Sequence, residues 1–404
     1  MCSTCKQHLD SVKKSSSLIN TDLSFLETPQ RSLTVTFPVL LDTGETKMIR
    51  GYRVQYNDAL GPTKGGIRIH QDADREEVSE LAFLMSLKTS LAGLPYGGAK
   101  GAIQINPKDY SATDLEKIIR RFTREISHHI GEDYDIPAPD VNTDPETMRI
   151  MLDEYERVIG KKSSATFTGK PVQSGGSLGR DTSTSKGGYY ILREHLGDRD
   201  PNDITVAIQG YGNVGSHLAE LLHTDGFKVV AVSDSSTALY NSQGLPVLEL
   251  SEWKNEGKRF SDRSEEKISN EELLELSVDI LAPSALGGVI ANNNANNIRA
   301  PLIIEMANGP VTPEADDILQ KKNVTVLPDI LANAGGVIVS YFEWVQNKEN
   351  VQWVADDVDT KLKEMILSAY GAVMKESRAE NVNIRTASYI LAIKRILERE
   401  AKRK

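Results

Sequence analysis

The chain contains the segment Ile204-Thr205-Val206-Ala207-Ile208-Gln209-Gly210-Tyr211-Gly212-Asn213-Val214-Gly215, in which an apolar strand runs directly into a glycine-rich turn. Residues 216–224 then have helical character, and a second apolar strand, 227–232, ends just before Asp234, nineteen positions after the last glycine. A lone G-x-G-x-x-G is weak evidence, but its place between a strand and a helix, with an acidic residue at this spacing, indicates dinucleotide binding. The predicted cofactor-binding residues are Gly210, Gly212, Asn213, Val214, Gly215 and Asp234.

Each glycine of this motif has a different structural role. Gly210 permits the tight turn, Gly212 lets backbone N–H groups approach a pyrophosphate, and Gly215 allows close helix–strand packing. The helix N-terminus stabilises the phosphate charge. Asp234 would accept hydrogen bonds from an adenosine ribose and repel a 2′-phosphate, which favours NAD over NADP. The serines around Asp234 (Ser233, Ser235 and Ser236) could instead bind a phosphate, so NADP stays possible.

Short apolar runs alternate with amphipathic segments through the second half of the chain. This alternation predicts a parallel sheet with helices on its faces, a doubly wound arrangement of the Rossmann type. A glycine- and serine-rich stretch, 169–188, is the candidate domain junction before it. The predicted strands are 203–209, 228–233, 279–282, 301–305 and 324–328.

Composition excludes several classes of protein. The chain has 404 residues, with 47 basic and 57 acidic side chains, a net charge of −10 and no large basic cluster, so a nucleic-acid partner is not expected. No uncharged apolar run reaches the length of a membrane span. The two cysteines, Cys2 and Cys5, suit a reducing cytoplasm, and the scattered histidines predict no catalytic metal.

The first half of the chain has a mixed pattern. The first thirty residues are rich in Ser, Thr and Lys and are expected to be flexible. Alternating apolar residues predict a strand at 33–39, and residues 50–56 read as extended. Helical periodicity follows at 73–92, 111–130 and 145–159. The tail from Ser340 reads as mainly helical.

Three lysines in this half occupy unusual positions. Lys64 and Lys100 lie within glycine-rich runs, and Lys88 lies on the apolar face of the helix predicted at 73–92. A single such lysine usually extends its amine to solvent. Clustered amines in a desolvated site bind carboxylates and lower one another's pKa, so that one of them can be neutral and act as a general base. Asp140, on a segment stiffened by Pro137 and Pro139, supplies a carboxylate for proton transfer.

These residues together resemble the amino-acid dehydrogenases typified by glutamate dehydrogenase. The resemblance runs in order from about residue 31 to the end of the chain. The matching segments are 51–55, 61–68, 95–101, 137–140, 168–171, 175–177 with 179–180, the glycine fingerprint at 210–215, 305–310 and 333–340.

The resemblance implies reversible oxidative deamination of L-glutamate to 2-oxoglutarate and ammonia, with hydride passing from Cα to a nicotinamide. It implies that Lys100, as a neutral base, activates water, that Asp140 shuttles the proton of the amino nitrogen, and that Lys88 binds the α-carboxylate. It implies that Lys64 and Ser340 hold the side-chain carboxylate. Further cofactor contacts are implied for Thr184, Asn213, Asn308 and Asn333.

Lys64 is the residue that indicates which substrate the chain binds. Relatives acting on leucine, phenylalanine or valine are apolar at this position and at the one matching Ser340. A buried lysine facing an aliphatic side chain would be an unpaired charge, whereas facing a carboxylate it gains a charge-assisted hydrogen bond. The alternatives are a dehydrogenase for another amino acid and a catalytically weak regulatory homologue.

The chain departs from the family pattern in a few places. Ser185 stands where a glycine is usual and restricts φ, and Lys186 adds charge nearby. Met85 replaces a glutamine that many relatives carry. These departures concern the catalytic rate and the choice of cofactor, and they leave the three lysines and Asp140 intact.

The expected fold class is therefore α/β, with an N-terminal α/β substrate domain and a doubly wound Rossmann-type dinucleotide domain around a deep cleft. The predicted ranges are 1–30 for a flexible segment, 31–185 for substrate binding and catalysis, 186–335 for the dinucleotide, and 336–404 for a helical segment returning to the first domain. By resemblance, the chain is expected to form a homohexamer.

Overall fold

The computed structural model describes residues 3–14 and 17–403, and these residues form two compact units. The first unit contains the chain up to Arg180 together with Val337–Val358 and Tyr389–Lys404. The second contains Asp181–Gly336 and Asp359–Ser388. Cys2 and the side chain of Cys5 lie outside the described residues.

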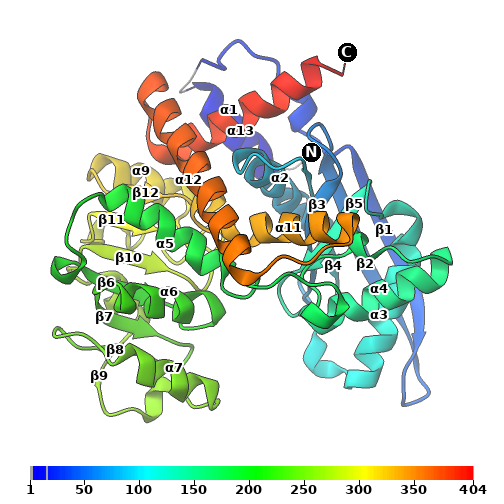
Figure 1. Ribbon diagram of the computed structural model, residues 1–404, viewed down its shortest axis with the longest axis horizontal. Helices are drawn as coiled ribbons and strands as arrows, with labels where there is room; N and C mark the ends of the chain where they lie inside the picture. Colours follow the sequence, from blue (N-terminus) through cyan, green and yellow to red (C-terminus); the bar gives the residue numbers. More distant parts are fainter. Residues whose placement is uncertain (1–2, 15–16, 404) are drawn as a thin grey trace. The chain divides into compact units, whose positions relative to one another are not determined.

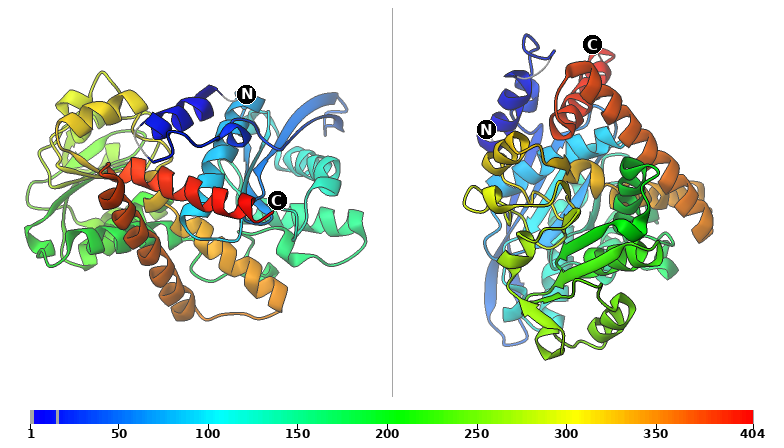
Figure 2. Two further views of the ribbon diagram at one scale, coloured as in Figure 1. Left: turned by 90° about the horizontal axis from the view of Figure 1, so that it is seen from above. Right: turned by 90° about the vertical axis from the view of Figure 1, so that its left-hand side faces the viewer.

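The first unit is built on a mixed sheet in the order β1-β2-β4-β3-β5 (Figure 1). β1 and β2 form a long antiparallel hairpin, which Figure 2 shows from two further directions. β2 also pairs antiparallel with β4, whereas β4, β3 and β5 run parallel to one another. The strands are β1 Arg31–Leu40, β2 Thr46–Asn57, β3 Thr63–Ile69, β4 Gly97–Ile103 and β5 Asp135–Pro139.

The predicted helices of this unit are confirmed as α2, α3 and α4, and local capping residues determine where they begin. Asp74 caps α2 by accepting a hydrogen bond from the backbone of Glu77. Asp144 and Thr147 form a capping box at α4, with Pro145 as its first residue. The helices are α2 Arg75–Leu91, α3 Ala112–Ile126 and α4 Pro145–Ile159.

The N-terminal segment, expected to be flexible, contains a helix, α1 Ser3–Lys14. Leu9 and Val12, spaced for one face of that helix, are buried, and so are Leu23 and Leu26 beyond it. These apolar residues are few among the serines and lysines, which is why composition alone did not indicate the helix.

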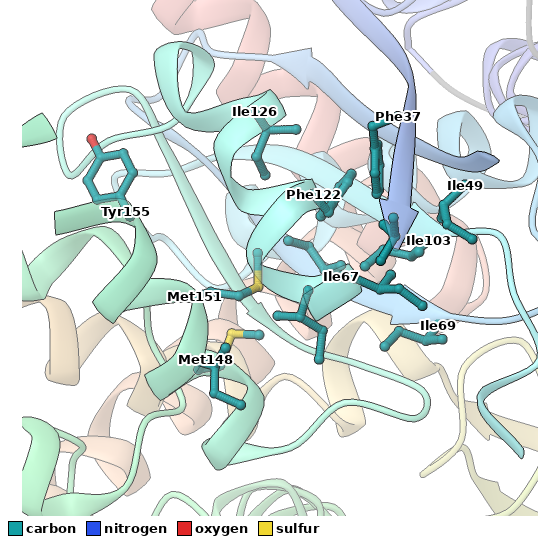
Figure 3. Packing of buried hydrophobic residues seen from close by; sticks show 14 of the residues in the cluster. Phe37, Ile49, Ile67, Ile69, Ile103, Phe122, Ile126, Met148, Met151 and Tyr155 are labelled. Carbon is teal, nitrogen blue, oxygen red and sulfur yellow. The ribbon is translucent and has the colours of Figure 1, made fainter. Parts of the chain in front are cut away.

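One apolar core joins the sheet of the first unit to α3 and α4 (Figure 3). Phe37 and Ile49 on the hairpin face Phe122 of α3, with the two phenylalanine rings 6.3 Å apart. Met148 and Met151 continue the cluster onto α4. Burial of these side chains, at about 1.5–3 kcal/mol each, fixes the helices against the strands that carry the predicted site.

A buried ion pair ties together two strands of this sheet that are not neighbours. Arg53 on β2 donates from Nε and Nη2 to both carboxylate oxygens of Asp135 on β5, at 2.8 and 2.5 Å. Its third nitrogen donates to the carbonyl oxygen of Gly65 on β3 at 3.1 Å, and Gln55 donates to Asp135 at 2.9 Å. Both members of the pair are 1% exposed or less, so neither charge is hydrated.

The second unit is built on a sheet in the order β12-β11-β10-β6-β7-β8-β9. The five strands predicted from the sequence are all present and run parallel. β8 and β9 extend one edge antiparallel, and they were not predicted because three residues are too few to show a period. The strands are β6 Thr205–Gln209, β7 Lys228–Ser233, β8 Ala238–Tyr240, β9 Glu266–Ile268, β10 Ile280–Pro283, β11 Leu302–Ile304 and β12 Thr325–Leu327.

The helices of the second unit connect these strands, and the C-terminal segment is helical as predicted. Among the described residues, no helix is long and apolar enough to cross a membrane. The helices of the second unit are α5 Ser183–Leu196, α6 Asn213–Thr224, α7 Val247–Asn255, α8 Asn270–Leu274, α9 Pro313–Lys321 and α10 Asp329–Ala332. The C-terminal helices are α11 Gly335–Glu349, α12 Ala355–Glu380 and α13 Ile384–Ala401.

The C-terminal segment is divided between the units, whereas the sequence predicted all of it on the first domain. Asp359–Ser388 groups with the second unit. Two ion pairs join this stretch to the rest of the second unit, one between Asp359 and Lys186 at 2.9 Å and one between Arg385 and Glu305 at 2.7 Å.

Replacing Arg53 with methionine tests the buried pair. Arg53→Met leaves the carboxylate of Asp135 buried without its cation, so the free energy of unfolding should fall by about 3–5 kcal/mol. Urea denaturation followed by tryptophan fluorescence measures it. The matched control is Arg31→Met, which removes an exposed pair with Asp58 and should cost less than about 1 kcal/mol. Equal losses in the two variants would contradict the structural importance of the buried pair.

Candidate substrate and cofactor sites

Lys64 lies on β3, and its side chain is almost completely buried, with the residue 1% exposed. Burial, together with the positive charges of Arg53 and Arg180, holds the pKa of this lysine well below its ordinary value. The carboxylates of Glu343 and Asp135 act in the opposite direction and are outweighed. The charged form of Lys64 is therefore disfavoured until an anion comes close.

Both carboxylates near Lys64 are already paired with other cations. Asp135 holds Arg53, and Glu343 on α11 forms an ion pair with Lys170 at 2.7 Å in which neither side chain is exposed. Glu343 also accepts a hydrogen bond from the backbone of Gly169 at 2.7 Å. The charges around Lys64 thus have a positive sum, and the site favours an added carboxylate.

Ser340 lies on α11, one turn before Glu343, and is buried. Its hydroxyl accepts a hydrogen bond from Nε of Arg180 at 3.1 Å. Arg180 is also one of the cations that lower the pKa of Lys64. The structure therefore brings Ser340 and Lys64 into the same electrostatic environment, as their predicted shared role requires.

Lys100 on β4 and Asp140, which directly follows β5, form the second predicted pair. The Lys100 amine lies 3.0 Å from one carboxylate oxygen of Asp140, and Arg68 donates to the other at 2.8 Å. Burial raises the pKa of Asp140, but Lys100 and Arg68 outweigh it and lower that pKa to about 2. Asp140 is therefore ionised at neutral pH and keeps the Lys100 amine in one place.

The glycine runs around these lysines permit close backbone approach. A Cβ at Gly65 would overlap the carbonyl of Ala99 on the neighbouring strand. A Cβ at Gly98 would overlap the backbone of Ser86, so helix α2 can lie directly on β4 only because this residue is glycine. Lys88, in the last turn of α2, is buried as a result of this packing.

All three predicted lysines, Asp140 and Ser340 lie in the first unit, and none of the lysines extends into bulk solvent. Residue exposures of Lys64, Lys88 and Lys100 are 1%, 9% and 5%. Sequence reasoning assigned no role to Arg53, Arg68, Arg180 or the Lys170–Glu343 pair. Arg68 and Arg180 do occur within the family-like segments, which was the available signal.

The glycine fingerprint of the second unit has the predicted form. Gly210 has a positive φ of 96°, and a Cβ at Gly215 would overlap the carbonyl of Gly210, so this helix–strand packing needs glycine. A Cβ at Gly212 would meet no atom within 4 Å, and no side chain caps the N-terminus of α6. The residues therefore fit a pyrophosphate, since both space and N–H donors are available there.

Asp234 has a different environment from the one expected of a ribose acceptor. Its oxygens accept hydrogen bonds from the backbone and hydroxyl of Ser236, the backbone of Thr237, the amine of Lys254 and the backbone of Phe260. Burial raises the pKa of Asp234, but the bonds from Ser236, Lys254 and Phe260 lower it well below its usual range. A carboxylate has about four lone-pair directions, so this one is fully occupied by the protein.

The departures at Ser185 and Lys186 are accommodated in helix α5. Ser185 has no positive φ, and its hydroxyl donates to the carbonyl of Val214 at 2.8 Å, which connects α5 to the first turn of α6. The Lys186 charge is paired with Asp359. Thr184 lies between Ser185 and the start of the helix and is half-buried.

Asn308 and Asn333, both predicted for the nicotinamide end, are brought together. The Asn333 amide donates to Oδ1 of Asn308 at 3.2 Å and to the carbonyl of Ala307 at 3.1 Å. Behind them, Asp329 accepts a hydrogen bond from the backbone of Gly309 at 2.9 Å. Within residues 3–14 and 17–403, no group of three or more side chains could hold a metal ion.

The chain matches known family patterns and known sequences. The pattern of Glutamate/Leucine/Phenylalanine/Valine dehydrogenase matches residues 175–403, and that of Glu/Leu/Phe/Val dehydrogenase, dimerisation domain, matches residues 29–157. Glutamate dehydrogenase of Thermotoga maritima is 48% identical over 383 residues, covering 94% of this chain and 92% of that protein. NADP-specific glutamate dehydrogenase of Synechocystis is 46% identical over 385 residues, covering 92% and 90%.

Comparison with solved structures gives the same result. The hetero-hexameric glutamate dehydrogenase of Thermus thermophilus, crystallised with leucine bound, superimposes with a TM-score of 0.94. It is 32% identical and covers 99% of this chain and 96% of its own.

The pKa of Asp140 predicts an acid-side loss of stability. The pKa of Asp140 is about 2 in the folded protein and 3.8 when the carboxyl is unpaired. The stabilisation of the fold by this carboxylate is therefore complete above about pH 5 and is lost as the pH falls towards 2. It amounts to about 2 kcal/mol. The free energy of unfolding, measured by urea denaturation from pH 6 to 2.5, should decline less steeply in Asp140→Asn.

Lys100→Met is the companion variant, because it removes the ammonium that lies 3.0 Å from the Asp140 carboxylate and lowers this pKa. Without that ammonium the folded pKa of Asp140 lies closer to its unfolded value, so the acid-side decline should be smaller than in the unaltered protein. Identical profiles for all three proteins would contradict the assigned role of the pair.

Proposed function

Because the chain belongs to the glutamate/leucine/phenylalanine/valine dehydrogenase family, we propose that it is a glutamate dehydrogenase. It catalyses the reversible oxidative deamination of L-glutamate to 2-oxoglutarate and ammonia, with NAD or NADP as coenzyme. In this reaction the Cα of the substrate loses a hydride, water adds to the resulting iminium carbon, and ammonia leaves.

The observation that carries the choice of glutamate within this family is the burial of Lys64. Its amine forms no ion pair within the part of the chain that the structure describes, and the nearby carboxylates are committed to Arg53 and Lys170. An aliphatic side chain placed there would leave the desolvated amine without a polar partner, whereas a carboxylate would favour its charged form. The side-chain carboxylate of glutamate supplies the missing partner, with Ser340 as a second donor.

The remaining roles follow from the pairs already described. Lys88 binds the α-carboxylate of the substrate. Lys100, in its neutral form, removes a proton from the attacking water, and Asp140 orients the Lys100 amine and exchanges protons with the amino nitrogen. The 3.0 Å separation of Lys100 and Asp140 supports this assignment, because proton exchange needs hydrogen-bond distance.

The second unit holds the coenzyme in this proposal. Gly210, Gly212, Val214 and Gly215 shape the pyrophosphate site, and Thr184, Asn213, Asn308 and Asn333 bind the rest of the dinucleotide, with Asp234 at its ribose end. When bound, the coenzyme would supply a nicotinamide as the acceptor of the hydride. The chain's own contribution is to present unblocked N–H groups at α6 and to hold Asn308 and Asn333 together.

The family includes a dimerisation domain that matches residues 29–157, and a similar solved structure is hexameric. These findings support an oligomer, and we propose a homohexamer of this chain. The small number of cysteines supports a cytoplasmic location.

Steady-state absorbance at 340 nm with L-glutamate and each coenzyme tests the function, and Lys100→Ala tests its mechanism. The variant loses the proposed base, so kcat should fall by about 10²- to 10⁴-fold. Binding of the coenzyme, followed by calorimetry, should persist because its residues lie in the second unit. Lys161→Ala, on the surface, is the control. Turnover retained by Lys100→Ala would refute the assignment.

Lys64→Leu tests the substrate assignment. Without the amine, kcat/KM for glutamate should fall by about a hundredfold or more, since the substrate carboxylate loses its charge partner. The kcat/KM for norvaline, which lacks that carboxylate, should change far less. The unliganded variant should unfold at an equal or higher urea concentration, because an apolar side chain replaces a buried amine that has no ion-pair partner among the described residues. Equal losses for both substrates would sink the specificity argument.

A further inference from the structure

The only Asn-Gly step in the sequence lies in the loop after β11, at Asn308 and Gly309. Both residues are exposed, so water and base can reach them. Gly309 has a φ of 54°, a left-handed conformation that glycine adopts without strain. The turn therefore favours glycine at the position where the absence of a Cβ leaves the preceding asparagine most open to attack by the backbone.

An asparagine in this setting can lose its side-chain amide without an enzyme, and asparagine is accordingly among the thermolabile residues. The backbone nitrogen of Gly309 gives up its proton to a base and attacks Cγ of Asn308. The bond from that nitrogen to Cγ forms, the bond from Cγ to Nδ2 breaks, and Nδ2 takes a proton from water and leaves as ammonia. Water then opens the resulting succinimide ring at either carbonyl and yields aspartate or isoaspartate, so the net reaction consumes one water and releases one ammonia.

The nitrogen that would attack is held by a carboxylate. The N–H of Gly309 donates to Oδ2 of Asp329, the first residue of α10, at 2.9 Å. Asp329 is 5% exposed, its Oδ1 accepts from the backbone of Ile330 at 2.7 Å, and its own N–H donates to Glu305 at 2.8 Å. The carboxylate is thus fixed in place. A negative charge at this distance opposes the negative charge that the nitrogen must acquire before it can attack.

The side chain that would be attacked is held as well. Oδ1 of Asn308 accepts a hydrogen bond from the amide of Asn333 at 3.2 Å. Asn333 is 9% exposed, and its amide also donates to the carbonyl of Ala307 at 3.1 Å, so this donor cannot follow Asn308 freely. Cγ of Asn308 must give up this contact to turn towards Gly309. The reaction therefore has to break two hydrogen bonds that the fold provides.

We propose that Asn308 is a site of spontaneous deamidation in this protein, and that the carboxylate of Asp329 slows the reaction by holding the N–H of Gly309. The product places a new carboxylate beside Asn333, or, as isoaspartate, adds a carbon to the backbone before Gly309. Either product removes the amide that the proposed function places at the nicotinamide end. That consequence for the coenzyme rests on the proposed function, whereas the modification itself does not.

Incubation of the full-length protein at neutral and at mildly alkaline pH tests the proposal. Peptide mapping by tandem mass spectrometry assigns each deamidated residue, and enzymatic methylation of isoaspartate counts the second product. Asn308 should be the first asparagine to react, and faster at the higher pH because a base must take the proton of Gly309. The same residue should react at least about tenfold faster in protein unfolded in urea, since unfolding removes a hydrogen bond to a charged group.

Asp329→Asn separates the charge from the shape of the side chain. The amide oxygen can still accept the N–H of Gly309, but the negative charge is gone, so deamidation of Asn308 should accelerate by about tenfold. Asp279→Asn is the matched control in the same unit, because Asp279 likewise accepts a backbone N–H, that of Thr205 at 2.9 Å. This control should leave the rate at Asn308 unchanged.

Thermal unfolding curves show whether Asp329→Asn remains folded. A folded Asp329→Asn that reacts no faster at Asn308 than Asp279→Asn would overturn the inference. Equal rates at Asn308 in the folded and the urea-unfolded protein would overturn it too, and that comparison needs no variant. Fresh protein that binds neither NAD⁺ nor NADP⁺ would instead contradict the proposed function and leave the chemistry at Asn308 standing.

Discussion

The ion pair between Arg53 and Asp135 is the interaction on which the first unit depends. It joins β2 to β5 across two intervening strands, and the third nitrogen of Arg53 donates to Gly65 on β3. Because Arg53 occupies Asp135, that carboxylate cannot neutralise Lys64. In the same way, the pair with Lys170 prevents the Glu343 carboxylate on α11 from neutralising Lys64. These two internal pairs leave the buried amine of Lys64 without an ion-pair partner among the described residues, so that a ligand carboxylate can take this place.

In the second unit, too, internal pairing decides which groups remain for a ligand, but there the engaged group is a carboxylate. There a carboxylate, Asp234, is fully engaged by the protein, and the groups left without partners are donors. Arg385, with Glu305 and Asp316, forms another internal network, in which Glu305 is fully buried and also accepts the backbone N–H of Asp329. In both units, therefore, the charges that the protein satisfies internally determine which charges remain for ligands.

Local sequence patterns predicted the fold well, but they did not predict which side chains distant in the sequence would pair. The strand–turn–helix at 204–224, the five parallel strands and helices α2 to α4 follow from short-range period and capping. The lysines were recognised because a charge within a glycine run is conspicuous. The pairs that occupy the carboxylates around Lys64 were not recognised, because Arg53 lies 82 positions from Asp135 and Gly169 lies 174 from Glu343. No periodicity relates such positions, and a carboxylate looks the same in sequence whether it is free or engaged, as Asp234 illustrates.

The electrostatics also limit how protons can move in the proposed reaction. With a pKa of about 2, Asp140 hardly binds a proton at neutral pH while Lys100 and Arg68 are both charged beside it. Lys100 and Arg68 lower this pKa together, each through its charge and through a hydrogen bond to the carboxylate. Proton exchange by Asp140 in the proposed reaction therefore depends on the Lys100 amine that lies 3.0 Å from it. A mechanism that assigns them independent roles would overlook the contact that gives each its chemistry.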